Sequence, residues 1–384
     1  MSTEQQSEPA GQQPDQAEPA PPRSRLKRMA KWSAAVLVVL VAVVAWAIQD
    51  DVRTLASLRR IEGTNAYVMD YYCDYHLDQL RDGMDVRHVE NEFLDAYFPT
   101  PIAAVAKRVR TVFVPETVEV LPSDTQFCST VVYRNEQGQM LVGRNLDWKH
   151  DACLVLRVHR EGRVASVSVI DLHYLNMNRP DLEETSLVDR IPLLFAPYYV
   201  TDGMNAHGVA ISGMTLDGSR PPRDSSKPDM LHATDMRLVL DYAKTTGEAI
   251  DLLGQYNIHF VETPCHYLIA DAGGHSAVVE FLDGEMRVTN RDGAWQVCTN
   301  DQIWDRSEAE CDEDCDRYRR ASAMLAGYSG PIDVEAIMDV MDEVSVPDWT
   351  MWSSVYNLTT GEMLLTHRKG EDRTKRTKLT IEME

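Results

Sequence analysis

Residues 128–148 read CSTVVYRNEQGQMLVGRNLDW and predict a β-hairpin with reactive groups at its open end. Two apolar runs flank the turn EQG, which is the pattern of two short antiparallel strands. The second run leads back to Arg144 and Asp147, which therefore lie beside Cys128 at the start of the first. A cysteine in such a place is most often a small buried hydrophobe. Here a guanidinium favours the thiolate and a carboxylate orients a nearby amine, so we predict a reactive thiol.

The hairpin also carries a longer pattern, Cys-x-x-Val-x6-Gly-x4-Gly-Arg-Asn-Leu-Asp-aromatic. This pattern resembles the nucleophile segment of the N-terminal-nucleophile (Ntn) hydrolases of linear amide C–N bonds. That family groups choloylglycine hydrolases with enzymes similar to acid ceramidase and N-acylethanolamine acid amidase. Later segments resemble its other motifs, in the same order along the chain: Asp202–Ala210, Thr299-Asn300 with Trp304, Asp316–Arg320 and Tyr356–Gly361. The similarity spans roughly residues 120 to 370, and the order of the motifs supports it more than any later motif alone.

The resemblance implies a role for each matching residue. Cys128 becomes the nucleophile, and Arg144 and Asp147 lie around its amine and thiol. Asn300 becomes an oxyanion donor, and Arg317 a residue that supports the site.

At three positions the match to the family pattern is less direct: the late arginine, Asn205 and Thr215. Arg319 and Arg320 fit the late arginine motif as well as Arg317 does. Asn205 and Thr215 are assigned to substrate binding or to the oxyanion site. The bile salt hydrolase branch has an asparagine where this chain has Thr215, whose hydroxyl can still donate a hydrogen bond.

The chemistry that the resemblance implies is hydrolysis of an N-acyl amide through an acyl-thioester. An amide is a poor electrophile, so the nucleophile must be activated and the oxyanion must meet preorganised donors. Autoproteolysis before Cys128 would free an α-amine with a pKa of about 7.7 to 8.0, a base suited to neutral pH. We therefore expect a small-molecule substrate and no metal or cofactor. Two alternatives stay open: an acyltransferase to an amine acceptor, and a surface-anchored binding module without activity.

The histidines and the other cysteines suggest no second site. None of the 11 histidines lies in a recognisable metal or triad motif, and we expect His150, His207 and His266 to be surface or packing residues. Cys311 and Cys315 lie in an acidic run that lacks the spacing of a calcium loop. We expect a solvated loop with a local disulfide there. Without Cys128, six of the seven cysteines remain, an even number compatible with disulfides in an exported protein.

The N-terminus predicts a membrane anchor. Residues 1–31 are rich in Gln, Glu, Pro and Ser, and we expect a disordered cytoplasmic tail. Residues 32–49 carry no charge and would form a helix about 27 Å long, enough to cross the hydrocarbon layer. Basic residues precede this segment and Asp50 and Asp51 follow it, which places the catalytic domain outside the cytoplasm of a single-pass membrane protein. The alternative is a signal peptide cleaved at Ala45-Trp46-Ala47, which would give a secreted protein.

The amino-acid composition argues against nucleic acid and a structural zinc ion as partners. The 384 residues include 38 Lys+Arg and 60 Asp+Glu, a net charge of -22. This charge repels a phosphate backbone, so we expect no nucleic acid partner. A structural zinc ribbon is also excluded, because the chain has no C-x2-C pair.

The remaining pattern predicts an α+β fold. We expect residues 52–127 to be mainly helical, including Val52–Gly83 and Asn91–Tyr97, with further helices at Thr234–Tyr256, restarting at Thr246, and at Asp333–Val344. Strands are expected at Ser129–Tyr133, Met140–Gly143, Cys153–Val158, Val164–Ile170, Gly208–Thr215, His266–Asp271, Ala277–Phe281, Met286–Thr289, Ser353–Thr359 and Glu362–His367. The family resemblance implies that residues 128–384 form a four-layer αββα sandwich, preceded by one transmembrane helix.

Overall fold

Two β-sheets form the centre of the fold in a computed structural model, which describes residues 23–83, 127–159, 163–232, 234–260, 264–291, 293–328, 331–369 and 373–383. The nine-stranded sheet has the order β1 (Arg59–Arg60), β2 (Ala66–Tyr71), β5 (Cys153–Val158), β6 (Ser166–Asp171), β7 (Val200–Asn205), β8 (Val209–Thr215), β11 (Cys265–Asp271), β12 (Ser276–Leu282) and β13 (Glu285–Asn290). The six-stranded sheet has the order β14 (Trp295–Cys298), β3 (Phe127–Arg134), β4 (Met140–Asp147), β15 (Thr350–Asn357), β16 (Glu362–His367) and β17 (Arg376–Thr380).

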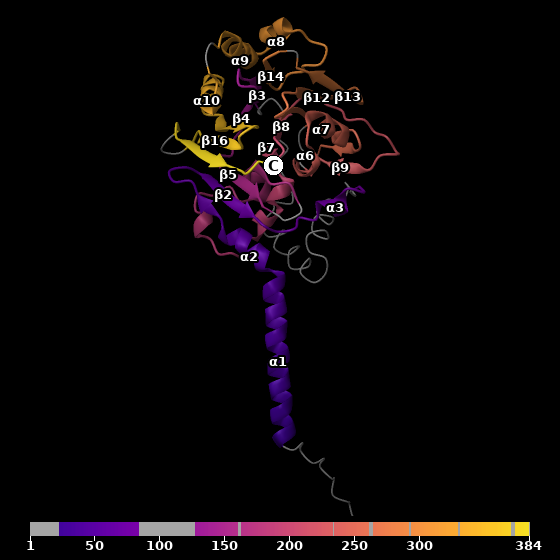
Figure 1. Ribbon diagram of the computed structural model, residues 1–384, viewed down its shortest axis with the longest axis vertical. Helices are drawn as coiled ribbons and strands as arrows, with labels where there is room; N and C mark the ends of the chain where they lie inside the picture. The colour runs from indigo at the N-terminus through magenta and orange to yellow at the C-terminus, as the bar shows by residue number, and fades with distance from the viewer. Residues whose placement is uncertain are drawn as a thin grey trace, which may run out of the picture. The chain divides into compact units, whose positions relative to one another are not determined.

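Helices cover one face of each sheet. α9 (Asp316–Gly327) packs on β14 and β3, and α10 (Val334–Glu343) packs on β4, β15 and β16, with α8 (Glu308–Asp314) beside α9. α6 (Thr234–Tyr242) packs on β7 and β8, and α7 (Thr246–Leu253) on β11 and β12 (Figure 1). The compact unit from Asp50 to Glu384 thus has helix, sheet, sheet and helix layers. The predicted α+β class is confirmed.

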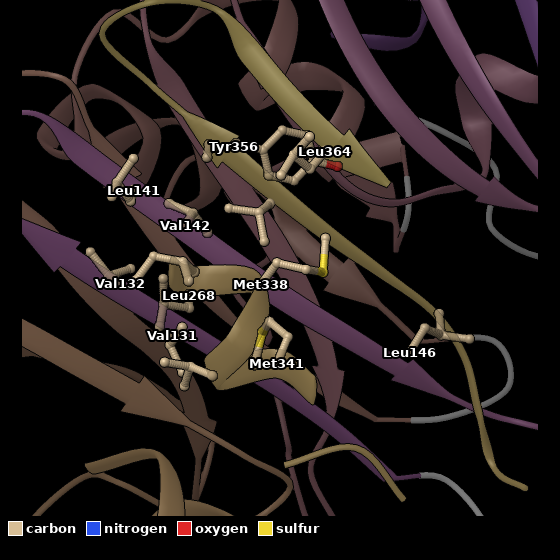
Figure 2. Packing of buried hydrophobic residues seen from close by; sticks show 14 of the residues in the cluster. Val131, Val132, Leu141, Val142, Leu146, Leu268, Met338, Met341, Tyr356 and Leu364 are labelled. Atoms are coloured by element: carbon tan, nitrogen blue, oxygen red, sulfur yellow. The ribbon is translucent and has the colours of Figure 1, made fainter. Parts of the chain in front are cut away.

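The core lies between the two sheets and under both helix layers. Because side chains alternate along a strand, Val155 of β5 joins the cluster between the sheets, whereas Leu154 and Leu156 join a second cluster on the opposite face. This explains why β5 reads as one continuous apolar run. On the other sheet, Met338 and Met341 of α10 belong to the same cluster as Val131 and Val142 (Figure 2).

Gly143 permits the close approach of α10 to β4. A Cβ added at this position would lie 2.7 Å from Ile337 Cγ2 and 2.9 Å from Met341 Sδ. Any side chain there would push the helix away from the strand, one residue before Arg144.

Most of the predicted elements after residue 127 are confirmed. All the strands predicted in this part of the chain are present, with ends that differ by at most four residues. The long predicted helix is divided into α6 and α7, and Thr245 caps the restart at Thr246 by accepting a hydrogen bond from the Glu248 amide. The remaining elements of this region are β9 (Asp229–Leu231) paired with β10 (Asn257–His259), and the 3-10 helices Leu172–Leu175, Leu182–Glu184 and Ile191–Tyr198.

The helical prediction for Val52–Gly83 is wrong over most of its length. α2 (Gln49–Ala56) is helical, but residues 66–71 form β2 and only the short α3 (Leu77–Leu80) follows. Tyr67 and Met69 face one apolar cluster while Ala66 and Val68 face another. A strand that is buried on both faces places apolar residues at mixed spacings, which we read as helical periodicity. The other predicted helix, at residues 91–97, lies outside the described residues.

The predicted loop with a disulfide at Cys311 and Cys315 is also wrong. Cys311 lies in α8, which Ser307 and Glu310 cap reciprocally in a capping box. Both cysteines are buried thiols in the largest apolar cluster. A cysteine placed in a core satisfies its side chain by packing rather than by a covalent bond.

The N-terminal unit contains α1 (Arg23–Ala47). Residues 23–31 are helical rather than part of a disordered tail, because Arg, Lys, Leu and Ala are good helix formers that continue the apolar segment. By length and apolar composition, no single helix in the described ranges suffices to cross a membrane, whereas Lys31–Ala47 and Gln49–Ala56 as a bent pair do. The anchor stays a prediction.

Candidate active site

The hairpin of β3 and β4 carries the first three candidate residues. Its antiparallel register pairs Phe127 with Asp147 and Thr130 with Arg144, so that Arg144 and Asp147 return to the start of β3, as the sequence predicted. The Arg144 Nη2 lies 3.8 Å from the Cys128 Sγ. A guanidinium is therefore held at the thiol, with both side chains buried.

Arg144 is held by two strands of the facing nine-stranded sheet, β7 and β8. Its Nη2 donates to the Gly213 carbonyl at 2.6 Å, and its Nε lies 3.5 Å from the Asp202 Oδ1. Asp202 in turn accepts from the Ser354 hydroxyl at 2.6 Å and the Tyr356 hydroxyl at 2.5 Å. This buried carboxylate balances the guanidinium charge and restricts its orientation. The sequence analysis gave Asp202 no role, although this acidic residue begins the Asp202–Ala210 motif quoted there.

Asn300 connects the thiol-bearing strand with the nine-stranded sheet. Its Oδ1 accepts from the Cys128 amide at 2.5 Å, and its Nδ2 donates to the Thr215 carbonyl at 2.9 Å. Asn300 follows β14, whose Cys298 pairs with Thr130 of β3. Strand pairing thus explains how residues more than 170 positions apart meet.

Arg317 is the arginine of its motif that reaches the site. Its Nη1 donates to the Cys128 carbonyl at 2.5 Å, and its Nη2 donates to the Asn300 Oδ1 at 3.0 Å. Arg319 and Arg320 instead pair with Asp316 on the exposed side of α9. The structure therefore selects Arg317 among the three candidates.

Thr215 lies at the end of β8 and lines a pocket of about 330 Å³ together with Phe127, Asn300 and Arg317. Four aspartates also contribute to its lining: Asp217, Asp301, Asp314 and Asp316. Space for a small molecule is thus present beside the residues that surround Cys128.

The structure does not bring Asn205 to this site. Its Oδ1 accepts from the amides of His207 and Val209, and its Nδ2 donates to the carbonyls of Leu240 and Ala243. Two of these bonds lie within the β7–β8 turn, and the other two join the turn to the C-terminal end of α6. The assignment of Asn205 to substrate binding is therefore wrong, because a buried amide with every hydrogen-bonding position used has none left for a substrate.

Two buried acidic groups at the site, the Cys128 thiol and the Asp147 carboxyl, have raised pKa values. Burial raises the pKa of the Cys128 thiol above its usual range, and the Arg144 guanidinium opposes that shift. Burial likewise raises the pKa of Asp147 to about 6. The Thr350 hydroxyl at 2.5 Å and Arg317, whose Nη1 lies 3.5 Å from the Asp147 Oδ2, offset part of this rise. In the intact chain the thiol therefore needs a base to ionise it.

The raised pKa of Asp147 predicts a pH-dependent stability. Folding takes up a proton on this group between its unfolded pKa of 3.8 and its folded value of about 6. Its contribution to the free energy of unfolding therefore falls as pH rises through that window, by about 3 kcal/mol in all. Asp147→Asn removes this titration. Urea unfolding of both proteins should show the variant gaining stability relative to the parent between pH 4 and pH 7, and a constant difference would contradict the assignment.

No group of three or more His, Cys, Asp or Glu side chains suited to a metal ion occurs in the described ranges. Of the three histidines considered above, His150 stacks on His173 with ring centroids 3.6 Å apart, and His207 lies in the β7–β8 turn. His266 is fully buried.

Residues 128–324 match the family described as linear amide C–N hydrolases, choloylglycine hydrolase family. A penicillin V acylase of Pectobacterium atrosepticum is 30% identical over 118 residues, which make up 28% of this chain and 31% of that protein. The match thus spans about a third of the length of that relative.

Solved structures give a likeness in fold. A mutant of the conjugated bile acid hydrolase of Clostridium perfringens aligns with a TM-score of 0.50 and 14% identity, over 66% of this chain and 92% of that one. The penicillin V acylase of Agrobacterium tumefaciens aligns with a TM-score of 0.49 and 20% identity, over 66% and 86% of the two chains.

Proposed function

We propose that the protein hydrolyses an N-acyl amide with Cys128 as nucleophile, because this chain belongs to the choloylglycine hydrolase family of linear amide C–N hydrolases. The observation that carries the proposal is the convergence of polar groups on one cysteine. Arg144 lies at its thiol, Asn300 accepts from its amide nitrogen, and Arg317 donates to its carbonyl.

The proposed base is the α-amine of Cys128, freed by cleavage of the Phe127–Cys128 bond. Asn300 would then hold this amine through one of its hydrogens and leave the nitrogen lone pair for the thiol proton. Arg144 supports the resulting thiolate by its positive charge.

The proposed reaction has two halves. The Cys128 Sγ bonds to the substrate carbonyl carbon, its proton passes through the α-amine to the leaving nitrogen, and the C–N bond breaks. Water then attacks the thioester, the S–C bond breaks, and a carboxylic acid leaves as the thiol regains a proton. An amide side chain carries two N–H donors, and Asn300 uses one on the Thr215 carbonyl. The second is assigned to the oxyanion of each tetrahedral intermediate.

The names of the relatives indicate which acyl groups should be tested in the substrate. Their names refer to penicillin V and to conjugated bile acids, so the acyl groups to be tested range from aryl and short linear chains to sterol acids. The amine partner is held constant in such a series so that only the acyl group varies.

The test uses the purified full chain and fluorogenic N-acyl coumarin amides. We expect release of the fluorescent amine with a marked dependence on the acyl group. Arg317→Ala should lower turnover roughly tenfold or more, because it removes contacts to both Cys128 and Asn300. Arg319→Ala is the matched control and should change turnover by less than about twofold, since exposed ion pairs contribute little. Absence of release from every amide would refute the proposed activity.

A further inference from the structure

A buried His–Glu pair lies behind Asn300, and the proposed reaction does not use it directly. We propose that His266 and Glu280 are positioning residues that hold Asn300 in place for the oxyanion. This inference rests on the proposed role of Asn300. Both side chains are 0% exposed, so neither is accessible to a substrate.

His266 fixes the residue before Asn300. Its Nε2 lies 2.7 Å from the Thr299 carbonyl oxygen. A carbonyl only accepts, so the Nε2 carries the hydrogen and donates it. The Nδ1 faces the Glu280 Oε1 at 3.3 Å. Glu280 thus orients the Nδ1 side of the ring, and the Nε2 side of the ring orients Thr299.

Glu280 fixes the residues after Asn300. Its Oε1 accepts from the Ile303 amide at 2.9 Å, and its Oε2 accepts from the Trp304 amide at 2.5 Å. A buried carboxylate is costly unless donors surround it, and here two backbone amides donate to it. The segment 299–304 is therefore tied to one side-chain pair at both of its ends.

This arrangement links the two sheets at the site. His266 lies on β11 and Glu280 on β12 of the nine-stranded sheet, whereas the segment that they hold follows β14 of the six-stranded sheet. Asn300 itself joins Cys128 of β3 to Thr215 of β8. A shift of this segment would therefore move the oxyanion donor relative to the nucleophile, and such shifts of about 1 Å are costly to catalysis.

His266 and Glu280 are expected to affect turnover through Asn300. Polar groups elsewhere in the core are expected to affect stability alone. His266→Leu removes the donor to Thr299 and should lower kcat roughly tenfold, with little change in KM, because the lost interaction matters in the transition state. His266→Gln offers an amide donor and should restore most of the loss. In an Asn300→Ala background, His266→Leu should have little further effect on kcat.

His367 supplies the matched control. It is also buried, and its ring nitrogens lie 2.6 Å from the carbonyl oxygens of Lys369 and Asp151. His367→Leu should lower the melting temperature without lowering kcat selectively, and its effect should add to that of Asn300→Ala. If His266→Leu is also additive with Asn300→Ala, the positioning role is overturned.

A second measurement tests the inference without depending on enzymatic activity or on the stability of the His266→Leu variant. Glu280→Gln is close in shape, and amide hydrogen exchange at Ile303 and Trp304 should speed up in this variant relative to the parent and to His367→Leu. Unchanged exchange at both amides would overturn the inference even if the parent hydrolyses amides. Faster exchange in a protein whose parent hydrolyses no amide would instead refute the proposed function and leave the loop-holding contacts supported.

Discussion

Cys128→Ala is expected to abolish amide hydrolysis, with a fall in kcat/KM of at least about 10³-fold. The proposed covalent intermediate forms on this thiol, and Arg144 and Asn300 surround it rather than replace it. The substitution removes one buried sulfur, so the fold should persist. Hydrolysis of a fluorogenic amide and thermal unfolding of the same sample separate the two effects.

The control for this prediction is Cys153→Ala. Cys153 is another fully buried thiol, on β5, and lines neither the site nor its pocket. Its loss should lower stability to a similar extent and leave turnover in place. Comparable turnover by the Cys128→Ala protein would exclude the thiol mechanism.

Processing is the second large expected effect. The purified protein should consist of residues 1–127 and 128–384 if, as we propose, the Cys128 Sγ attacks the Phe127 carbonyl, the C–N bond breaks and water hydrolyses the thioester. The Cys128 nitrogen gains the proton that makes it an amine. Cys128→Ala should remain a single chain. Intact mass and N-terminal sequencing measure both outcomes, and a full-length species that still hydrolyses amides would show that another group is the base.

The two pieces should stay together after the cut. β2 lies in the nine-stranded sheet, paired in parallel with β5 from Ala66 opposite Cys153 to Tyr71 opposite Val158. The Tyr75 hydroxyl also donates to the Asp241 carboxylate of α6 at 2.6 Å. Separation of the pieces should therefore require denaturant, and their elution as two species from a native column would contradict this packing.

The sequence was most informative where one local pattern determined the geometry. The hairpin spacing alone predicted that Arg144 returns to Cys128, because an antiparallel register follows from a short turn. Arg317 could not be separated from Arg319 and Arg320 in this way. The choice depends on which face of α9 meets β14 and β3, and that is a tertiary contact.

The errors have separate physical origins. Asn205 lies in a motif that resembles one of the family, yet its side-chain amide stabilises a turn. No sequence spacing distinguishes an asparagine that stabilises a turn from one that binds a substrate. β2 was read as helix because burial on both faces conceals the alternation of a strand. Glu280 and His266 were hidden because each is a polar residue in an apolar strand. Their common target is the segment that follows β14, which is a tertiary contact.

The most direct test of the central claim is the mass of the Cys128 peptide during turnover. The protein is mixed with the best amide of the series, quenched in acid within the first turnovers, digested and analysed by mass spectrometry. The account predicts that the peptide beginning at Cys128 gains the mass of the acyl group less one hydrogen, and that hydroxylamine removes it as expected for a thioester. Turnover of the amide with no acyl group on Cys128, or with the acyl group on another residue, would contradict it.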